Sequence, residues 1–256
     1  MLLLALVPCF LAHADPVPVR YVQGAVHGFV EMRDEAGHIV AYGDLTRTVH
    51  GASITSHLTF HFKDGSLDDE TTVFTQRHSF QLISDHHIQK GPAFPHPIDM
   101  TIDVHSGRVT VRTTNKDGKE EAKTDHLDLK PDLANGIIPI LVENMRPDIP
   151  GATVSMVVAT PKPRLVKLAI FRNAAEDAYT LGGVERKAIH YTIKIDLGGV
   201  AAVVALLVGK APPDIQIWTI AGETATFARE IGPIYAEGPM MTIQLASPAW
   251  PESSSH

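Results

Sequence analysis

Histidine is the residue type whose chemistry stands out most in this sequence. The chain has 14 histidines in 256 residues, and the densest group is Asp85-His86-His87, with His96 following a proline-rich loop. Imidazole binds transition metals and can carry protons near neutral pH. Asp85, His86 and His96 are therefore the residues from which an enzyme of unknown type could be built, and this is one hypothesis for the function.

Local strand geometry argues against a metal site at these histidines. Successive side chains of a strand point to opposite faces, so His86 and His87 cannot both face one site. His57 and His61 are four residues apart, which on a strand places them about 13 Å from each other. The acidic run at residues 68–70 lacks the alternating ligands and the glycine of a calcium loop, and is expected to be a solvated hairpin end. We expect no metal ion and no cofactor.

The usual sequence signatures of catalysis are missing. The chain has no nucleophile-elbow, phosphate-loop, dinucleotide-binding or zinc-binding motif. It carries 22 Lys and Arg against 29 Asp and Glu, and a net charge of -7 repels a phosphate backbone. These observations favour a non-enzymatic protein that does not bind nucleic acid.

Any site in the first half of the chain must be positioned by strands. Residues 20–126 alternate between apolar and polar types in short runs, which is typical of half-buried antiparallel strands. In one run the following residues share a face: Ile54, Ser56, Leu58, Phe60 and Phe62. Glycine-containing turns separate the runs: Asp34-Glu35-Ala36-Gly37, Lys63-Asp64-Gly65-Ser66, His105-Ser106-Gly107 and Asn115-Lys116-Asp117-Gly118. The pattern predicts a meander.

The second half begins with a helical pattern and returns to strands. A short helix is predicted within residues 130–147, with Asp132 as its N-cap and Pro139 delaying or kinking it. Its buried stripe would contain Leu133, Ile137, Ile140, Leu141 and Asn144. Strands are expected at residues 153–159, 164–171 and 184–196, and in three runs after Pro213 that end near Leu245.

The segment Leu197 to Val208 is apolar on every side. As a helix of 12 residues it would reach about 18 Å, which is too short for the roughly 30 Å core of a bilayer. We expect a second short helix that plugs or lids the concave face of the sheet, with Val200, Val203, Val204 and Leu207 as lid or ligand-contacting residues. The alternative is a surface element that makes peripheral contact with acyl chains or a membrane.

The first residues favour export. Residues 1–14 are apolar and end in Ala12-His13-Ala14, which has the form of a signal-peptidase site. We therefore predict a signal peptide at 1–14, a single β domain at 15–251, a disordered tail at 252–256, and a periplasmic or secreted location. Cys9 is the one cysteine and lies in the leader, so a mature chain could form no disulfide. Lipidation of Cys9 is an alternative outcome of processing.

Several segments of the second half carry a resemblance: Pro131-Asp132-Leu133-Ala134-Asn135-Gly136, Gly209-Lys210-Ala211-Pro212-Pro213-Asp214 leading to Trp218, Gly232-Pro233-Ile234-Tyr235 with Gly238-Pro239, and Ser247-Pro248-Ala249-Trp250. With them the chain resembles a group of uncharacterised exported bacterial proteins. Their fold is related to the open half-barrel of lipoprotein-localisation factors and outer-membrane lipoprotein receptors. The resemblance implies a half-barrel but no catalytic or binding residues.

The expected fold is mainly β: a single curved antiparallel sheet, an open half-barrel, with two short helices. The expected function is that of an exported, non-enzymatic protein that binds a lipid or another lipophilic ligand in the concave face. The enzyme that uses Asp85, His86 and His96 is the alternative. An outer-membrane β-barrel fits less well, because such barrels have aromatic girdles and this chain is 6% aromatic.

Overall fold

The computed structural model describes residues 16–114, 119–146, 148–158, 160, 162–181, 184–196 and 212–246. In these residues the chain is mainly β, with one helix, α1 (Ile138–Asn144). The strands are β1 (Val26–Arg33), β2 (Ile39–His50), β3 (Ser53–Phe62), β4 (Leu67–Gln76), β5 (Phe80–Lys90), β6 (Ile98–Asp103), β7 (Arg108–Thr114), β8 (Glu120–His126), β9 (Gly151–Val158), β10 (Arg164–Leu181), β11 (Val184–Asp196), β12 (Ile215–Ile220), β13 (Thr226–Pro233) and β14 (Met240–Leu245).

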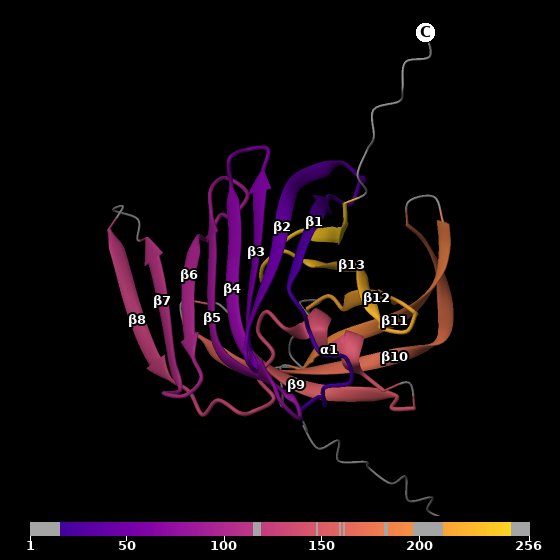
Figure 1. Ribbon diagram of the computed structural model, residues 1–256. Coiled ribbons are helices and arrows are strands. Elements are labelled where there is room, and N and C mark those ends of the chain that lie inside the picture. The colour runs from indigo at the N-terminus through magenta and orange to yellow at the C-terminus, as the bar shows by residue number, and fades with distance from the viewer. Residues whose placement is uncertain are drawn as a thin grey trace, which may run out of the picture.

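All the strands belong to one antiparallel sheet that does not close. Its order is β8-β7-β6-β5-β4-β3-β2-β1-β14-β13-β12-β11-β10-β9, so two meanders meet where β1 pairs with β14. The sheet is strongly curved: β1 to β8 form one wall and β9 to β13 the other, with α1 between them (Figure 1). The expectation of a mainly β, single curved and open antiparallel sheet is confirmed.

The local strand and turn predictions agree closely with the structure. In β3 the predicted inward face contains Ile54, Phe60 and Phe62, which are all buried. The predicted turns around Gly37, Gly65 and Gly107 are present. Each of these glycines has a positive φ, which residues other than glycine rarely adopt. The predicted turn at residues 115–118 lies outside the described residues.

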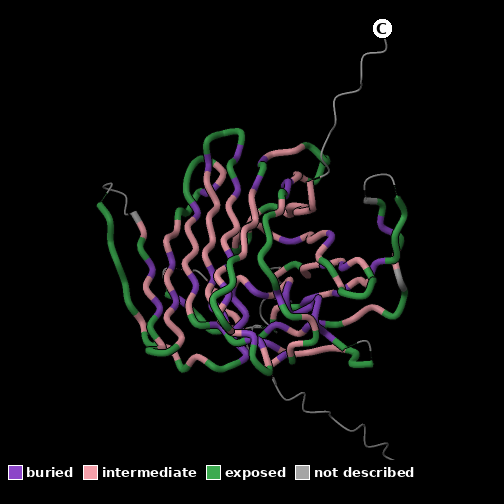
Figure 2. The backbone as a smooth tube through the Cα atoms, viewed as in Figure 1, coloured by how far each residue is buried: buried purple, intermediate pink, exposed green. Residues whose placement is uncertain are grey.

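Two apolar clusters fill the concave side of the sheet. The larger cluster joins both walls to α1 and to the segment before it, residues 130–137, which we call the approach to α1. The burial of Phe74, Ile102, Ile140 and Ile170 shows this. Figure 2 shows buried residues concentrated on α1 and on the strand segments around it. The smaller cluster lies where the loop between β5 and β6 inserts Phe94. The Phe94 ring contacts Phe62 and Tyr235, with centroid separations of 5.4 and 6.1 Å.

The helix starts later than the sequence pattern predicts. The five residues of its predicted stripe are all buried, but the helix begins at Ile138, and Asp132 is not its N-cap. Gly136 has a φ of 67°, which interrupts the helical path, and Pro139 lies in the first turn, where its missing N–H is tolerated. The second predicted helix, which includes Val200, Val203, Val204 and Leu207, lies outside the described residues.

The approach to α1 covers one edge of the sheet. The Ser155 backbone exchanges hydrogen bonds with Asp132 and Ala134, and the Ser155 hydroxyl donates to Asp132 Oδ2 at 2.9 Å. The Asn135 side chain bonds both backbone groups of Val157, each at 2.9 Å. These contacts satisfy the outer edge of β9, which would otherwise be open to another strand. The residues of β8, at the other end of the sheet, are mostly exposed.

Asn144 at the end of α1 anchors the segment that precedes β1. Its Oδ1 accepts from the backbone N–H groups of Arg20 and Tyr21 at 3.0 and 2.7 Å, and its side chain is fully buried. We expect Asn144→Ala to lower the free energy of unfolding by about 2 kcal/mol, because two backbone donors lose their partner. Urea denaturation measures this. Asn173→Ala is the control: Asn173 is half-buried and bonds side chains that can turn to water, so a loss of under ~1 kcal/mol is expected.

Candidate interior carboxylate site

Charged side chains of β4 and β5 lie on the concave face of the sheet. Glu70 is opposite His87 in the strand register, and Thr72 is opposite Asp85. Because residues two apart share a face, Asp68 lies on the same side as Glu70. These charged side chains form a layer between the larger and the smaller apolar cluster. We call Asp68, Glu70, Asp85 and His87, together with Glu230 of β13, the interior carboxylate cluster.

His87 is held by a carboxylate from the neighbouring strand. Its Nε2 lies 2.7 Å from Asp68 Oδ1, and its Nδ1 lies 3.9 Å from Glu70 Oε1. A carboxylate only accepts hydrogen bonds, so Nε2 donates to Asp68. The Gln89 amide donates to Asp68 Oδ2 at 3.0 Å and to the Ile234 carbonyl at 2.9 Å. This second bond ties β5 to the loop that follows β13, across the concave side.

Asp85 is the most deeply buried member of the cluster, with a relative exposure of 1%. The Thr72 hydroxyl donates to its Oδ1 at 2.9 Å, whereas its Oδ2 has no hydrogen-bond partner in the described part of the chain. The backbone of Gly136 closes over this pair so tightly that a Cβ atom there would lie 2.0 Å from Thr72 Oγ1. The approach to α1 therefore forms one side of the site.

Glu230 reaches the cluster from the other wall. It pairs in register with Ile217 and Ile243, both of which belong to the apolar clusters, so its side chain lies on the concave face. Burial raises the pKa of the Glu70 carboxyl, and the charges of Asp68 and Glu230 add to this effect while that of His87 opposes it. Residues that are 160 positions apart in the sequence thus face each other because the sheet is curved.

Burial shifts the proton equilibria of the cluster. It raises the pKa of Asp85 to about 8, with a further contribution from Glu70, and it raises the pKa of Glu230 to about 7. Burial also raises the pKa of Glu70. Burial by itself would lower the pKa of His87, but the hydrogen bond to Asp68 and the nearby carboxylates raise it to about 10. Near pH 7 the site therefore holds a charged imidazolium and carboxyl groups that share protons.

The structure separates the residues of the enzyme hypothesis. Asp85 faces the concave side, whereas His86 faces the outer side, where its Nε2 lies 2.9 Å from Asp99 Oδ1. His96 is exposed in the loop between β5 and β6. The predicted separation of His86 from His87 onto opposite faces is confirmed, because His87 pairs with Asp68 on the concave face. Asp85, His86 and His96 are not brought together.

The acidic run at residues 68–70 is not a solvated hairpin end. It lies inside β4, where Asp68 and Glu70 face the concave side. Asp69 lies on the outer side, where its Oδ2 is 2.7 Å from His57 Nε2. The sequence interpretation missed this face because charged residues are normally solvated. The sequence did contain a signal for the shared face: Asp68 and Glu70 are two residues apart, as are Asp85 and His87, and residues two apart on a strand face the same side. Nothing local pointed to Glu230. Among the described residues, no three potential ligands are arranged to hold a metal ion.

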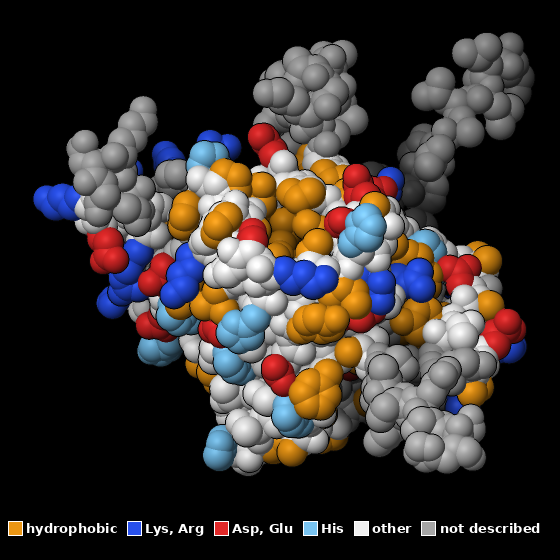
Figure 3. Space-filling view, turned by 90° about the horizontal axis from the view of Figure 1, so that it is seen from above, with side chains coloured by type: hydrophobic (Ala, Val, Ile, Leu, Met, Phe, Trp, Pro, Cys, Tyr) orange, Lys and Arg blue, Asp and Glu red, His pale blue; other side chains and the backbone are white. Residues whose placement is uncertain are grey.

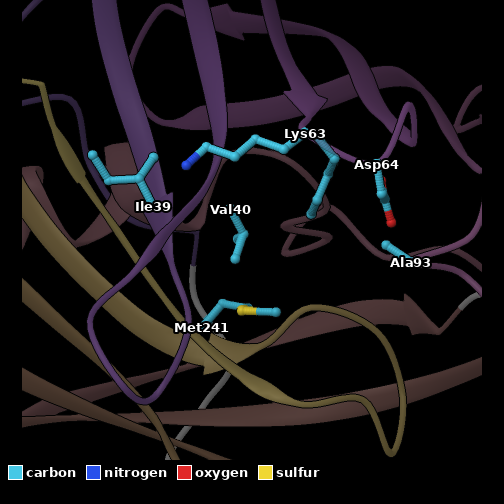
Figure 4. Close-up of a pocket in the computed structure, with 7 residues that line it drawn as sticks. Ile39, Val40, Lys63, Asp64, Ala93 and Met241 are labelled. Atoms are coloured by element: carbon cyan, nitrogen blue, oxygen red, sulfur yellow. The ribbon is translucent and has the colours of Figure 1, made fainter.

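A separate apolar pocket of about 240 Å³ lies at one end of the strands, beside the smaller apolar cluster. It is lined by Ile39, Val40, Phe62, Lys63, Asp64, Ala93 and Met241. Figure 4 shows the Lys63 side chain extending over the pocket towards Ile39. Viewed from above, hydrophobic side chains gather in the middle of this face of the molecule, with charged and histidine side chains around them (Figure 3).

Comparison with known proteins adds a similarity of fold. No known protein family and no curated protein match the chain. It is similar to a β-barrel-like protein of a domain of unknown function, DUF1849, from Brucella abortus, known from a crystal structure. The two share 9% identity over 89% of this chain and 98% of the other, with a TM-score of 0.47. Within the described residues no helix is long and apolar enough to cross a membrane.

Proposed function

We propose that this is an exported, non-enzymatic protein that binds a lipophilic ligand on the concave side of its half-barrel. The observation that carries the proposal is the apolar pocket of about 240 Å³ beside the smaller apolar cluster. Ligand sites are commonly apolar concavities with a few polar groups that orient the ligand. The apolar wall here is formed by the Phe62, Val40 and Met241 side chains.

Lys63 favours an acyl chain that ends in a carboxylate. Its side chain lines the pocket together with Asp64 and apolar residues, and Lys63 forms no ion pair with Asp64 or any other described residue. An ammonium group at the mouth of an apolar pocket attracts an anionic head group while the chain occupies the apolar part. A fatty acid has this combination of properties.

The apolar leader, and the resemblance to exported half-barrel proteins related to lipoprotein-localisation factors, support a periplasmic or secreted location. They agree with a role that requires contact with lipids, including peripheral contact with a membrane. In this proposal the segment with Val200, Val203, Val204 and Leu207 acts as the lid of the ligand site. The relationship to lipoprotein-localisation factors is part of the proposal.

We expect Met241→Asp to weaken the binding of a fluorescent fatty acid at least tenfold. The new carboxylate must lose water when the ligand binds, and it repels the ligand's own carboxylate. Titration of the fluorescent probe, followed by displacement with palmitate, measures the affinity. Native mass spectrometry of protein from its own host identifies any lipid that co-purifies.

Ile83→Asp is the matched control, because Ile83 is 39% exposed and does not line the pocket. This variant is expected to bind the probe as the wild type does. Wild-type protein that neither binds the probe nor carries lipid would contradict the proposal. Equal weakening by both variants would also contradict it, because the effect would then not come from the pocket.

A further inference from the structure

The interior carboxylate cluster contains more acidic groups than cationic partners. His87 donates to Asp68 and lies 3.9 Å from Glu70 Oε1, so one imidazolium faces four carboxyl groups: those of Asp68, Glu70, Asp85 and Glu230. Glu70 and Glu230 have no hydrogen bond to any described residue, and Asp85 Oδ2 is buried without a partner. Buried polar atoms are normally satisfied, so Asp85 Oδ2, the buried carboxyl oxygen of the cluster that has no partner, points to a missing donor.

Among the described residues, no lysine or arginine forms an ion pair with this cluster. Arg47 of β2 is a buried cation near the concave face, but the charge of Glu143 of α1 already acts on it, and Gln23 accepts from its Nη1 at 2.7 Å. The Nη1 of Arg47 is therefore held by Gln23 and its charge lies near Glu143, on its own side of the interior, whereas its Nε is buried without a partner among the described residues. Glu70 and Glu230 come from opposite walls, so a group bound between them would bridge the sheet.

Part of the cluster is open to solvent. The side chains of Glu70 and His87 keep 22% and 23% of their surface exposed, and that of Asp68 keeps 14%, although they lie deep among protein atoms. The same row of the sheet places Leu58 beside Glu70 and Met100 beside His87. The site therefore has acidic groups next to an apolar wall.

We propose that the interior carboxylate cluster binds the primary ammonium group of an organic amine, between Glu70 of β4, Asp85 of β5 and Glu230 of β13. A primary ammonium carries three N–H donors and no acceptor, which suits Asp85 Oδ2 and the carboxyl groups of Glu70 and Glu230. Leu58 and Met100 provide apolar surface for the alkyl part of the amine. The site is distinct from the pocket at Lys63, and the binding of an anionic lipid there is neither required nor excluded.

Binding of the amine is coupled to proton release. A cation favours the ionised carboxylates, so the proton that Asp85 and Glu230 retain near neutral pH must leave as the ammonium enters. We expect about one proton released for each ammonium bound at pH 7. An amine that merely adhered to the acidic surface of the protein would release almost none.

The test is calorimetric titration of the full chain with hexylammonium at pH 7, in two buffers of different ionisation enthalpy. Binding with proton release is expected for the wild type. Glu70→Gln and Glu230→Gln should each weaken binding at least tenfold. Hexanoate has the wrong charge and hexyltrimethylammonium has no N–H donor, so both are expected to bind at least tenfold more weakly than hexylammonium.

Asp69→Asn is the matched control, because Asp69 is the neighbouring acid on the outer face of β4. It removes the same formal charge from the same strand and should leave hexylammonium binding unchanged. Wild-type protein that does not bind hexylammonium, or binds it without proton release, would overturn the proposal. Equal losses for Asp69→Asn and Glu70→Gln would do the same, and the wild-type measurement remains decisive should a glutamine variant fail to fold.

Discussion

Gly136→Ala is expected to lower the free energy of unfolding by about 3 kcal/mol or more. A Cβ atom at this position would lie 2.0 Å from Thr72 Oγ1, far inside van der Waals contact, and 3.2 Å from Asp85 Oδ1, which is also close. The φ of 67° adds strain for any residue with a side chain. Relief would require the approach to α1 to move away from β4 and β5, which would open both the larger apolar cluster and the interior site. Urea denaturation, followed by circular dichroism, measures the loss.

Gly65→Ala separates the two contributions to this effect. Gly65 also has a positive φ, 88°, but a Cβ atom there would meet nothing within 4 Å. Its substitution is expected to cost about 1 kcal/mol, from backbone strain without a clash. Equal losses for the two variants would show that the close approach of Gly136 to Thr72 contributes nothing to stability.

The protein is expected to be several kcal/mol less stable at pH 9 than at pH 5. Asp85 and Glu230 have folded-state pKa values of about 8 and about 7, above their ordinary values of 3.8 and 4.5. The folded state therefore favours their protonated forms, and this stabilisation is lost as the pH rises from about 4 to about 8. The pKa of His87 is also raised, from 6.5 to about 10, so between these pH values the folded state keeps a proton that the unfolded state has lost. Stability therefore also falls as the pH rises through this range. Unfolding in urea at pH 5, 7 and 9 tests the sign.

Glu230→Gln should flatten this pH dependence, because glutamine keeps the shape of the side chain and cannot ionise. We expect the variant to be more stable than the wild type at pH 8, by about 2 kcal/mol, and close to it at pH 5. Asp103→Asn is the control, since the half-exposed Asp103 has a pKa lowered by its hydrogen bonds to Ser106 and is fully ionised throughout this range. Stability that rises from pH 5 to pH 9 would contradict the assignment of protons to the interior.

The strands could be predicted from the sequence because alternation is a local property. The run from Ile54 to Phe62 shows its inward and outward faces without reference to any other strand. The start of α1 could not be predicted in the same way. Asp132 has the residue type of an N-cap, but its backbone and side chain bond β9, which is a distant contact that no local pattern contains.

The interior site escaped prediction for a related reason. Periodicity places Asp85 and His87 on one face, but it does not say that this face is enclosed. Enclosure depends on the pairing of β1 with β14, which carries Glu230 to the far side of Glu70. Charged residues are also a poor signal of burial, because most of them are solvated. The fold class was therefore predictable, whereas the composition of the site depended on long-range closure.

The two ends of the sheet differ in a way that limits self-association. The residues around Asn135 occupy the outer edge of β9, and in the described part of the chain nothing pairs with the outer edge of β8. A chain with two free edges can add copies at both and grow into a fibre. Among the described residues the edge at β9 is occupied and the edge at β8 is open, so joining two molecules through β8 uses up that edge of each. Pairing through β8 would therefore end at a two-fold symmetric dimer.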